Sequence, residues 1–171
     1  MNKTLSVIAV VIDTLEVSKR FISSIKQYTS GDYELILIDN GSKNTSNVEL
    51  ALATIPHILI KLPTNEGFVD AINRGLAVST APTICLLNND TRVTAGWLEK
   101  CLKALYSDES FGIVGPLTGF SKHGCDSQHS LTLHSTLLPP LARAWDIDKT
   151  NKELEIHYSG RTSDMDFVAF M

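Results

Sequence analysis

Hydrophobic and polar residues follow two patterns along the first two-thirds of the 171-residue chain. Short apolar runs predict buried strands, and apolar residues that recur every three or four positions predict amphipathic helices. The predicted strands are residues 5–12, 35–38, 58–62, 83–87 and 113–114. The predicted helices are residues 17–28, 48–53, 68–78 and 97–105. This order predicts an α/β fold with a mostly parallel sheet and helices on both faces.

The regular pattern ends after Pro116. Residues 117–150 have no clear period, and the strand-like segments that follow are residues 154–158 and 167–170. The chain stops at Met171 inside an apolar run, so we expect a fold that is truncated at its C-terminus. Apolar side chains near this end predict some self-association.

Charge and hydropathy exclude several classes of protein. The net charge is −4 and the 15 basic residues are scattered, which argues against a nucleic-acid partner. No apolar stretch approaches the ~18 residues of a membrane span, and the first apolar run meets Asp13 directly, as a strand does and a signal peptide does not. Cys85 and Cys101 lie in apolar patterns and are expected to be buried thiols. We therefore expect a cytoplasmic protein.

Three polar clusters follow predicted strands at intervals of about 25 residues. They are Asp39-Asn40-Gly41-Ser42, the block 65–75 (Asn-Glu-Gly-Phe, then Ala-Ile-Asn-Arg-Gly), and Asn88-Asn89-Asp90-Thr91. Taken singly, the first two fit an ordinary turn and a helix cap at least as well as a ligand site. Because the carboxyl ends of parallel strands share one edge, one ligand could contact all three clusters.

The third cluster has the chemistry of a metal site. A diphosphate-bound Mg²⁺ or Mn²⁺ prefers oxygen ligands and takes only one or two carboxylates from the protein. Asp90 could supply that carboxylate, and Asn88 or Asn89 could contact ribose or metal-bound water. A plain Asn-Asp turn is the competing interpretation of the same residues.

In this order, the three clusters resemble the successive motifs of family 2 glycosyltransferases. The Asn-Asn-Asp-Thr form is similar to the branch that contains rhamnosyltransferase-like proteins, and the resemblance covers residues 5–118. It implies a GT-A (Rossmann-like) fold. It also implies an inverting, metal-dependent enzyme of polysaccharide biosynthesis that transfers a sugar from a nucleotide-diphosphate sugar to a saccharide or lipid-linked hydroxyl acceptor.

The resemblance also implies roles for individual residues. Asp39 would recognise the base, and Asp90 would hold Mg²⁺ or Mn²⁺. The remaining residues expected around the nucleotide-sugar are Val10, Val11, Asn65, Gly67, Arg74, Asn88 and Asn89. Residues 1–118 would form the nucleotide-sugar-binding subdomain. Residues 119–171 would be a connection and the incomplete start of an acceptor-side subdomain, with the catalytic base beyond Met171.

Three alternatives remain at this point. A non-catalytic nucleotide-sugar-binding module would need only the strand-end clusters. A nucleotidyltransferase usually has a Gly-rich loop after the first strand, and residues 10–16 contain no glycine. A receiver domain with Asp39 as phosphoacceptor needs two acids after the first strand, where this chain has only Asp13. His123, His129 and His134 are spaced unlike common metal ligands and are expected to be loop residues.

Overall fold

The computed structural model describes residues 3–13, 15–44, 49, 52 and 55–115. The chain divides into two compact units, Met1–Ala95 and Gly96–Met171, and the second is described only as far as residue 115. Several predictions therefore lie outside the described residues: the domain boundary after residue 118, the strands at 154–158 and 167–170, the loop histidines, and the self-association of the apolar C-terminus.

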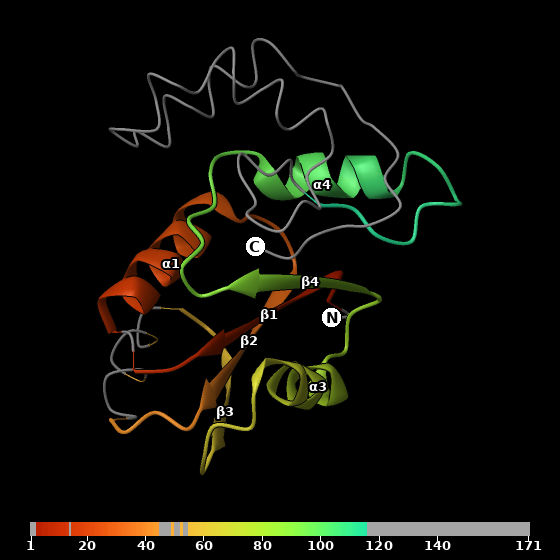
Figure 1. The fold of residues 1–171 in the computed structure, drawn as a ribbon. Coiled ribbons are helices and arrows are strands. Elements are labelled where there is room, and N and C mark those ends of the chain that lie inside the picture. The colour runs from red at the N-terminus through yellow and green to blue at the C-terminus, as the bar shows by residue number, and fades with distance from the viewer. Residues whose placement is uncertain (1–2, 14, 45–48, 50–51, 53–54, 116–171) are drawn as a thin grey trace, which may run out of the picture. The chain divides into compact units, whose positions relative to one another are not determined.

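The first unit contains a four-stranded parallel sheet (Figure 1). Its strands are β1 (Leu5–Val11), β2 (Tyr33–Asn40), β3 (Ile58–Leu62) and β4 (Thr83–Asn88), in the spatial order β3-β2-β1-β4. Its described helices include α1 (Leu15–Tyr28) and α3 (Phe68–Val78). The predicted α/β fold with a parallel sheet is confirmed.

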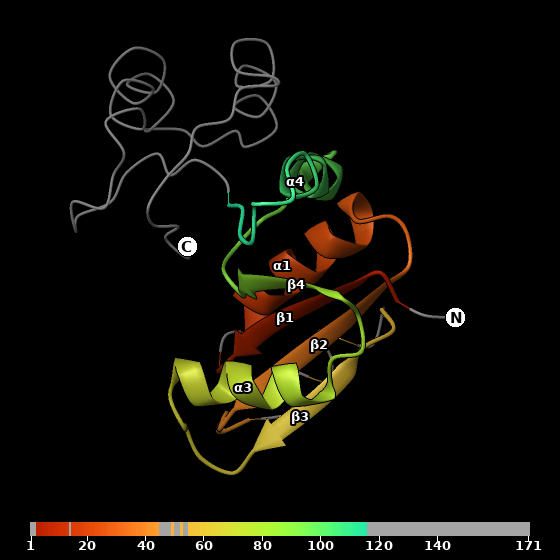
Figure 2. The same cartoon turned by 90° about the vertical axis from the view of Figure 1, so that its right-hand side faces the viewer.

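The sheet has one helix of this pair on each face (Figure 2). Successive strand residues point to opposite faces. Ile8 and Ile36 belong to a buried cluster that includes Ala71 and Ile72 of α3. The residues of opposite parity, such as Val7 and Leu37, are also fully buried, on the face that carries α1. Burial on both faces explains why β1 and β2 read as continuous apolar runs rather than alternating ones.

Helix α3 packs closely against the sheet because it carries a glycine where it crosses the strands. A Cβ atom at Gly75 would lie 2.6 Å from Ile8 Cγ2 and 2.9 Å from Ile38 Cδ1. Both distances are shorter than real carbon–carbon contacts, so a larger residue would push the helix away from the sheet. Helix α3 begins at Phe68, directly after the loop that leaves β3.

Strand β2 is longer than the predicted 35–38, and the expectation that a turn starts at Asp39 is wrong. Asp39 pairs with Val11 of β1 and with Lys61 of β3, and Asn40 pairs with Leu62. The backbone of β2 stays extended because strands on both sides continue to offer hydrogen bonds. The turn begins instead at Gly41.

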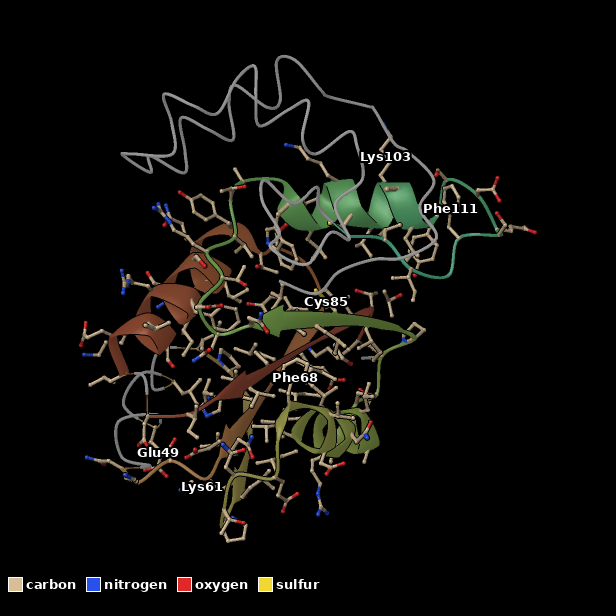
Figure 3. All side chains as sticks on the ribbon, viewed as in Figure 1. Glu49, Lys61, Phe68, Cys85, Lys103 and Phe111 are labelled. Carbon is tan, nitrogen blue, oxygen red and sulfur yellow. The ribbon has the colours of Figure 1, made fainter. Side chains whose placement is uncertain are left out.

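The other predicted elements have mixed outcomes. Glu49 and Leu52, the described residues of the predicted helix 48–53, are helical, and Glu49 forms an ion pair with Lys61 of β3 (Figure 3). In the second unit, helix α4 (Trp97–Leu105) has the predicted bounds. The predicted strand 113–114 is wrong, since Ile113 is 66% exposed and pairs with no strand among the described residues.

Two expectations drawn from hydropathy are tested by the described residues. Cys85 and Cys101 are thiols that form no disulfide within the described part of the chain, but they are half-buried rather than buried. Cys85 lies on β4, an outer strand of the described sheet, where fewer neighbours cover it. Over the residues that the structure describes, no helix combines the length and apolar character that a membrane crossing requires.

Candidate functional site

The strand ends bring the predicted site residues to one edge of the sheet. Val10 pairs with Asn88 of β4, and Val11 pairs with Asp39 of β2. Strand β1 therefore lies between the two polar ends, and two strand spacings separate Asp39 from Asn88 by about 10 Å. That span is within the reach of one nucleotide-sized ligand.

The connections of the sheet place a change of chain direction at this edge. The chain passes from β1 outward to β2 and β3, then crosses back to place β4 on the other side of β1. In open parallel sheets, ligands bind at the carboxyl ends of the strands where the chain changes direction in this way. Here that point lies between the ends of β1 and β4, next to Val10 and Asn88.

Asp39 is a buried carboxylate with one unsatisfied oxygen. Its side chain is 1% exposed, and its Oδ1 accepts a hydrogen bond of 3.0 Å from the backbone N–H of Ser42. Its Oδ2 is buried and has no hydrogen-bond partner within the described protein. Leaving a buried acceptor unpaired costs about 1–3 kcal/mol. A ligand N–H or O–H donor that reaches this oxygen would recover that free energy.

The turn after β2 touches the loop before α3. Gly41 has φ +80°, and a Cβ atom there would lie 2.5 Å from both Asn65 N and Thr64 C. Backbone atoms cannot give way as side chains do, so only glycine fits this contact. The first two polar clusters of the sequence are therefore in direct contact.

Asp13 joins the loop after β1 to the same turn. Its backbone N–H donates to Ser42 Oγ at 2.9 Å, and its Oδ1 accepts a hydrogen bond of 2.8 Å from Lys43 N. Asp13 has φ +42°, a conformation that short polar side chains tolerate better than most others. Asp39, Ser42 and Asp13 thus connect two strand-end loops into one wall of the site.

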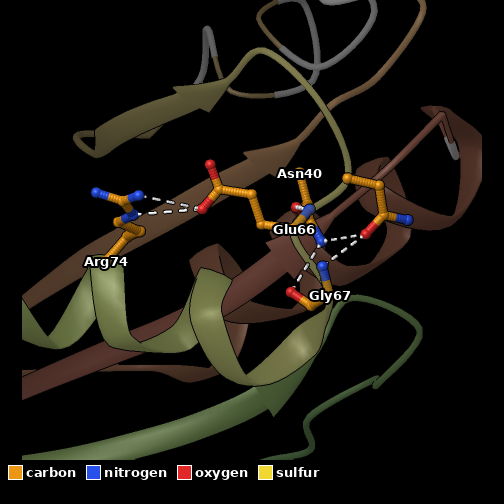
Figure 4. A network of polar contacts seen from close by, with 5 residues as sticks. Asn40, Glu66, Gly67 and Arg74 are labelled. Atoms are coloured by element: carbon orange, nitrogen blue, oxygen red, sulfur yellow. Dashed lines mark hydrogen bonds and ion pairs between the residues drawn. The ribbon is translucent and has the colours of Figure 1, made fainter.

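Asn40 connects β2 to the loop that begins α3 (Figure 4). Its Nδ2 donates to Asn65 Oδ1 at 3.0 Å and to the Gly67 carbonyl at 3.1 Å. Its Oδ1 accepts a hydrogen bond of 2.9 Å from Glu66 N. Asn65 Oδ1 also accepts a hydrogen bond of 2.9 Å from Gly67 N, so the amide oxygen of Asn65 is engaged within the loop.

Arg74 lies farther from the strand ends than the other predicted residues. It is six residues into α3, about 9 Å along a helix that runs away from the carboxyl edge. Its guanidinium pairs with Glu66 Oε2, with Nη2 at 3.3 Å and Nε at 3.4 Å (Figure 4). The pair is largely exposed on the arginine side, where an ion pair contributes little to stability.

The end of β4 supplies the third group of predicted residues. A turn follows the strand, with Thr91 N donating to Asn88 O at 3.1 Å. Asn88 and Asn89 are half-buried, whereas Asp90 is exposed. Among the described residues, no three His, Cys, Asp or Glu side chains gather as a self-sufficient metal site. One carboxylate flanked by neutral amides fits a cation that takes most of its ligands from a diphosphate and water.

Two further residues belong to this edge that the predicted set lacks. Asn40 and Asp13 both have side chains that hold strand-end loops together. Their place beside strand ends was visible in the sequence, but their partners lie 25 to 31 residues further along the chain. No local pattern could identify those partners.

A parallel α/β domain with polar groups at its carboxyl edge is a class with many functions. The particular family is shown by comparison: the family described as "Glycosyl transferase family 2" matches residues 6–157, and the chain belongs to this family. A PGL/p-HBAD biosynthesis glycosyltransferase of Mycobacterium tuberculosis is 32% identical over 89 residues, which are 48% of this chain and 34% of the relative. The glycosyltransferase YwdF of Bacillus subtilis is 26% identical over 101 residues, or 59% and 38% of the two chains.

Solved structures show the same fold. The mannosyltransferase PcManGT of Pyrobaculum calidifontis, described in complex with GDP-Man and Mn²⁺, matches with a TM-score of 0.58 and 18% identity over 64% of this chain and 34% of that one. Residues 1–349 of TarS from S. aureus match with a TM-score of 0.51 and 17% identity over 56% and 30%. These matches support the GT-A type of α/β fold. The chain spans a little over a third of the length of the curated relatives it matches.

Proposed function

We propose that this chain binds a nucleotide-diphosphate sugar at the carboxyl edge of its sheet and forms the donor side of a glycosyltransferase. The observation that carries the proposal is the buried, unpaired Oδ2 of Asp39. In a protein that binds nothing there, this oxygen would only lower stability, because an unpaired buried acceptor is costly. Family membership supports the sugar-transfer chemistry.

In this proposal Asp39 accepts a hydrogen bond from an N–H of the base. Val10 and Val11, at the adjoining end of β1, border the base. Asn65 and Gly67 line the nucleotide from the loop before α3. Asn65 contacts the turn at Gly41, and the Gly67 carbonyl accepts a hydrogen bond from Asn40. Arg74 would reach the diphosphate only after leaving Glu66, so we assign it the weakest contribution.

Asp90 is the residue that would hold a divalent cation. Mg²⁺ or Mn²⁺, bound there together with the donor, would offset the negative charge that develops on the leaving diphosphate. Asn88 and Asn89 would orient ribose or metal-bound water without adding charge. The complex of the mannosyltransferase PcManGT with GDP-Man and Mn²⁺ agrees with this donor chemistry.

The remaining chemistry extends the proposal beyond the described residues. We propose an inverting transfer in which a carboxylate base outside residues 3–115 deprotonates a hydroxyl of a saccharide or lipid-linked acceptor. The PGL/p-HBAD name of the mycobacterial relative supports a role in glycoconjugate synthesis. We further propose a cytoplasmic location and a place in the rhamnosyltransferase-like branch, on the basis of the Asn-Asn-Asp-Thr motif.

The proposal is tested by binding before turnover. Thermal unfolding is measured with UDP-, GDP- and dTDP-sugars, each with and without Mn²⁺, because only a ligand of the folded state raises the midpoint. We expect one nucleotide class to raise the midpoint in a Mn²⁺-dependent manner. If no nucleotide raises it at millimolar concentration, the proposed function is wrong.

A non-catalytic nucleotide-sugar-binding module is the second candidate. Asp39 and Asp90 favour this candidate, because both are proposed to contact the donor and neither is proposed to contact an acceptor. A transfer assay on residues 1–171 and on the longest natural form of the chain separates the two. Donor binding without acceptor-dependent turnover in either form would support the module.

A further inference from the structure

Asp39 and Asn40 are adjacent in β2 but serve opposite faces of the sheet, because successive strand residues alternate. Asp39 keeps one oxygen unpaired, whereas Asn40, which is 4% exposed, has its amide fully engaged. Both hydrogens of its Nδ2 are donated and its Oδ1 accepts one hydrogen bond. Asn40 therefore has no remaining N–H to offer a ligand.

All three hydrogen bonds of Asn40 go to one short segment, residues 65–67. The segment is held at a side-chain oxygen, a backbone N–H and a backbone carbonyl. The carbonyl is that of Gly67, which also accepts the first hydrogen bond of α3, from Ala71 N at 3.3 Å. One side chain thus determines where the loop and the first turn of α3 lie relative to the end of β2.

The backbone contact at Gly41 restricts how residues 65–67 can move. Because Gly41 already touches Asn65 N and Thr64 C, the loop cannot move toward β2 to compensate for a lost hydrogen bond. The loop can only move away from β2. Any loosening of residues 65–67 therefore displaces Asn65 and Gly67, the two residues of this loop that are proposed to line the nucleotide.

We propose that Asn40 is a positioning residue for the nucleotide site. It touches no ligand, and it holds residues 65–67 and the start of α3 in the geometry that the donor requires. This inference rests on the proposed function, since it concerns affinity for the same ligand. It adds a requirement for the two donor hydrogens of Asn40, which a carboxylate of the same shape lacks.

The test uses Asn40→Asp and Asn40→Ala in the full-length protein. Asn40→Asp keeps the acceptor for Glu66 N but faces the Gly67 carbonyl and Asn65 Oδ1 without a donor. Glu34→Gln is the matched control, because Glu34 also accepts several hydrogen bonds on β2 but lies at the opposite end of the strand. Hydrogen–deuterium exchange of the peptide 64–70 reports on the loop without ligand, and calorimetry with the nucleoside diphosphate and Mn²⁺ reports affinity.

We expect faster exchange in residues 64–70 and about tenfold weaker nucleotide binding for both Asn40 variants, at a temperature where each is folded. Glu34→Gln should lower the unfolding midpoint without changing either measurement. Unchanged exchange, or faster exchange with unchanged affinity, would overturn the inference. If the unaltered protein binds no nucleotide, the proposed function itself fails, and this inference fails with it.

Discussion

Strand β2 carries a carboxylate near each end, and the two differ in how many hydrogen bonds the protein gives them. Glu34, near the amino end, accepts hydrogen bonds from Ser6 Oγ at 2.5 Å, Thr80 N at 2.7 Å and Thr80 Oγ1 at 3.1 Å. Asp39, at the carboxyl end and about 17 Å away, has one hydrogen bond and one buried oxygen without a partner among the described residues. The same residue chemistry is thus satisfied at one edge of the sheet and unsatisfied at the other.

The comparison distinguishes a polar side chain that stabilises the fold from one that is available to a ligand. Glu34 links β1, β2 and the segment before β4, so its oxygens are consumed by the protein. Burial acts to raise the pKa of Glu34, but hydrogen bonds from Ser6, Thr80 and Ala81 outweigh it and hold the pKa below its ordinary value. At the other edge, the fold retains a buried carboxylate oxygen that it does not satisfy. Such an oxygen is expected where a ligand supplies the missing donor.

The largest expected effect concerns the two glycines that flank β2. Gly41→Ala should destabilise the protein by about 3 kcal/mol, because the new methyl group meets backbone at 2.5 Å and the residue keeps a positive φ. Gly31→Ala, at the amino end, is the matched control: its φ is +95° but nothing lies within 4 Å of the added carbon. For Gly31→Ala, urea unfolding should show that the free energy of unfolding falls by only about 1 kcal/mol. Equal losses would show that the contact at Gly41 is not tight.

Asp39→Asn should weaken nucleotide binding by about 10- to 100-fold, the effect of a hydrogen bond to a charged group. Asn keeps an acceptor for Ser42 N but turns an NH₂ group toward the position of the unpaired oxygen. Stability should change little, because the variant replaces one buried, unpaired acceptor with a buried, unpaired NH₂ group. Calorimetry and urea unfolding measure the two quantities, with Glu34→Gln as the control for affinity. A loss of stability with full affinity would make Asp39 a structural residue like Glu34.

Asp90→Ala should reduce Mn²⁺-dependent nucleotide affinity by about tenfold and leave the metal-free affinity nearly unchanged. Asn88→Ala, two residues earlier, should have a smaller effect, since a neutral amide is a poorer ligand for a hard cation than a carboxylate. Calorimetry with and without Mn²⁺ compares the two variants. Equal losses would contradict the assignment of the metal to Asp90.

How far the sequence predicted this molecule depends on the range of the interactions involved. The bounds of β3 and α3 were predicted because apolar spacing within each segment determines them. The end of β2 was not, because Asp39 and Asn40 remain extended only through pairing with β1 and β3. The apolar pair Ile113-Val114 is typical of a strand, but without a partner among the described residues it forms none.

The same distinction applies to the site. Asp39 could be proposed from the sequence because a carboxylate after an apolar run marks a strand end. Asn40 lies beside it, yet its function depends on residues 65–67, which only the folded chain brings to it. For Arg74 the sequence suggested too much: its charge predicted a contact with phosphate, but in the structure it forms an ion pair with Glu66. Residue type suggested candidates, and three-dimensional contacts decided what each side chain is free to do.

The smallest expected effect is the pH dependence contributed by Glu34. Because the pKa of Glu34 in the folded chain lies below its ordinary value of 4.5, its carboxylate stabilises the fold above that pH. The stabilisation is lost as the pH falls through the lower folded value, where the side chain becomes protonated in both states. Glu34→Gln should therefore be less stable than the unaltered protein at pH 7 by less than ~1 kcal/mol, since solvent screens a partly exposed group. The difference should shrink as the pH falls below 4.5 and through the lower pKa of the folded chain. Urea unfolding of both proteins at several pH values measures it. A difference that persists unchanged at low pH would show that Glu34 acts through packing rather than through its charge.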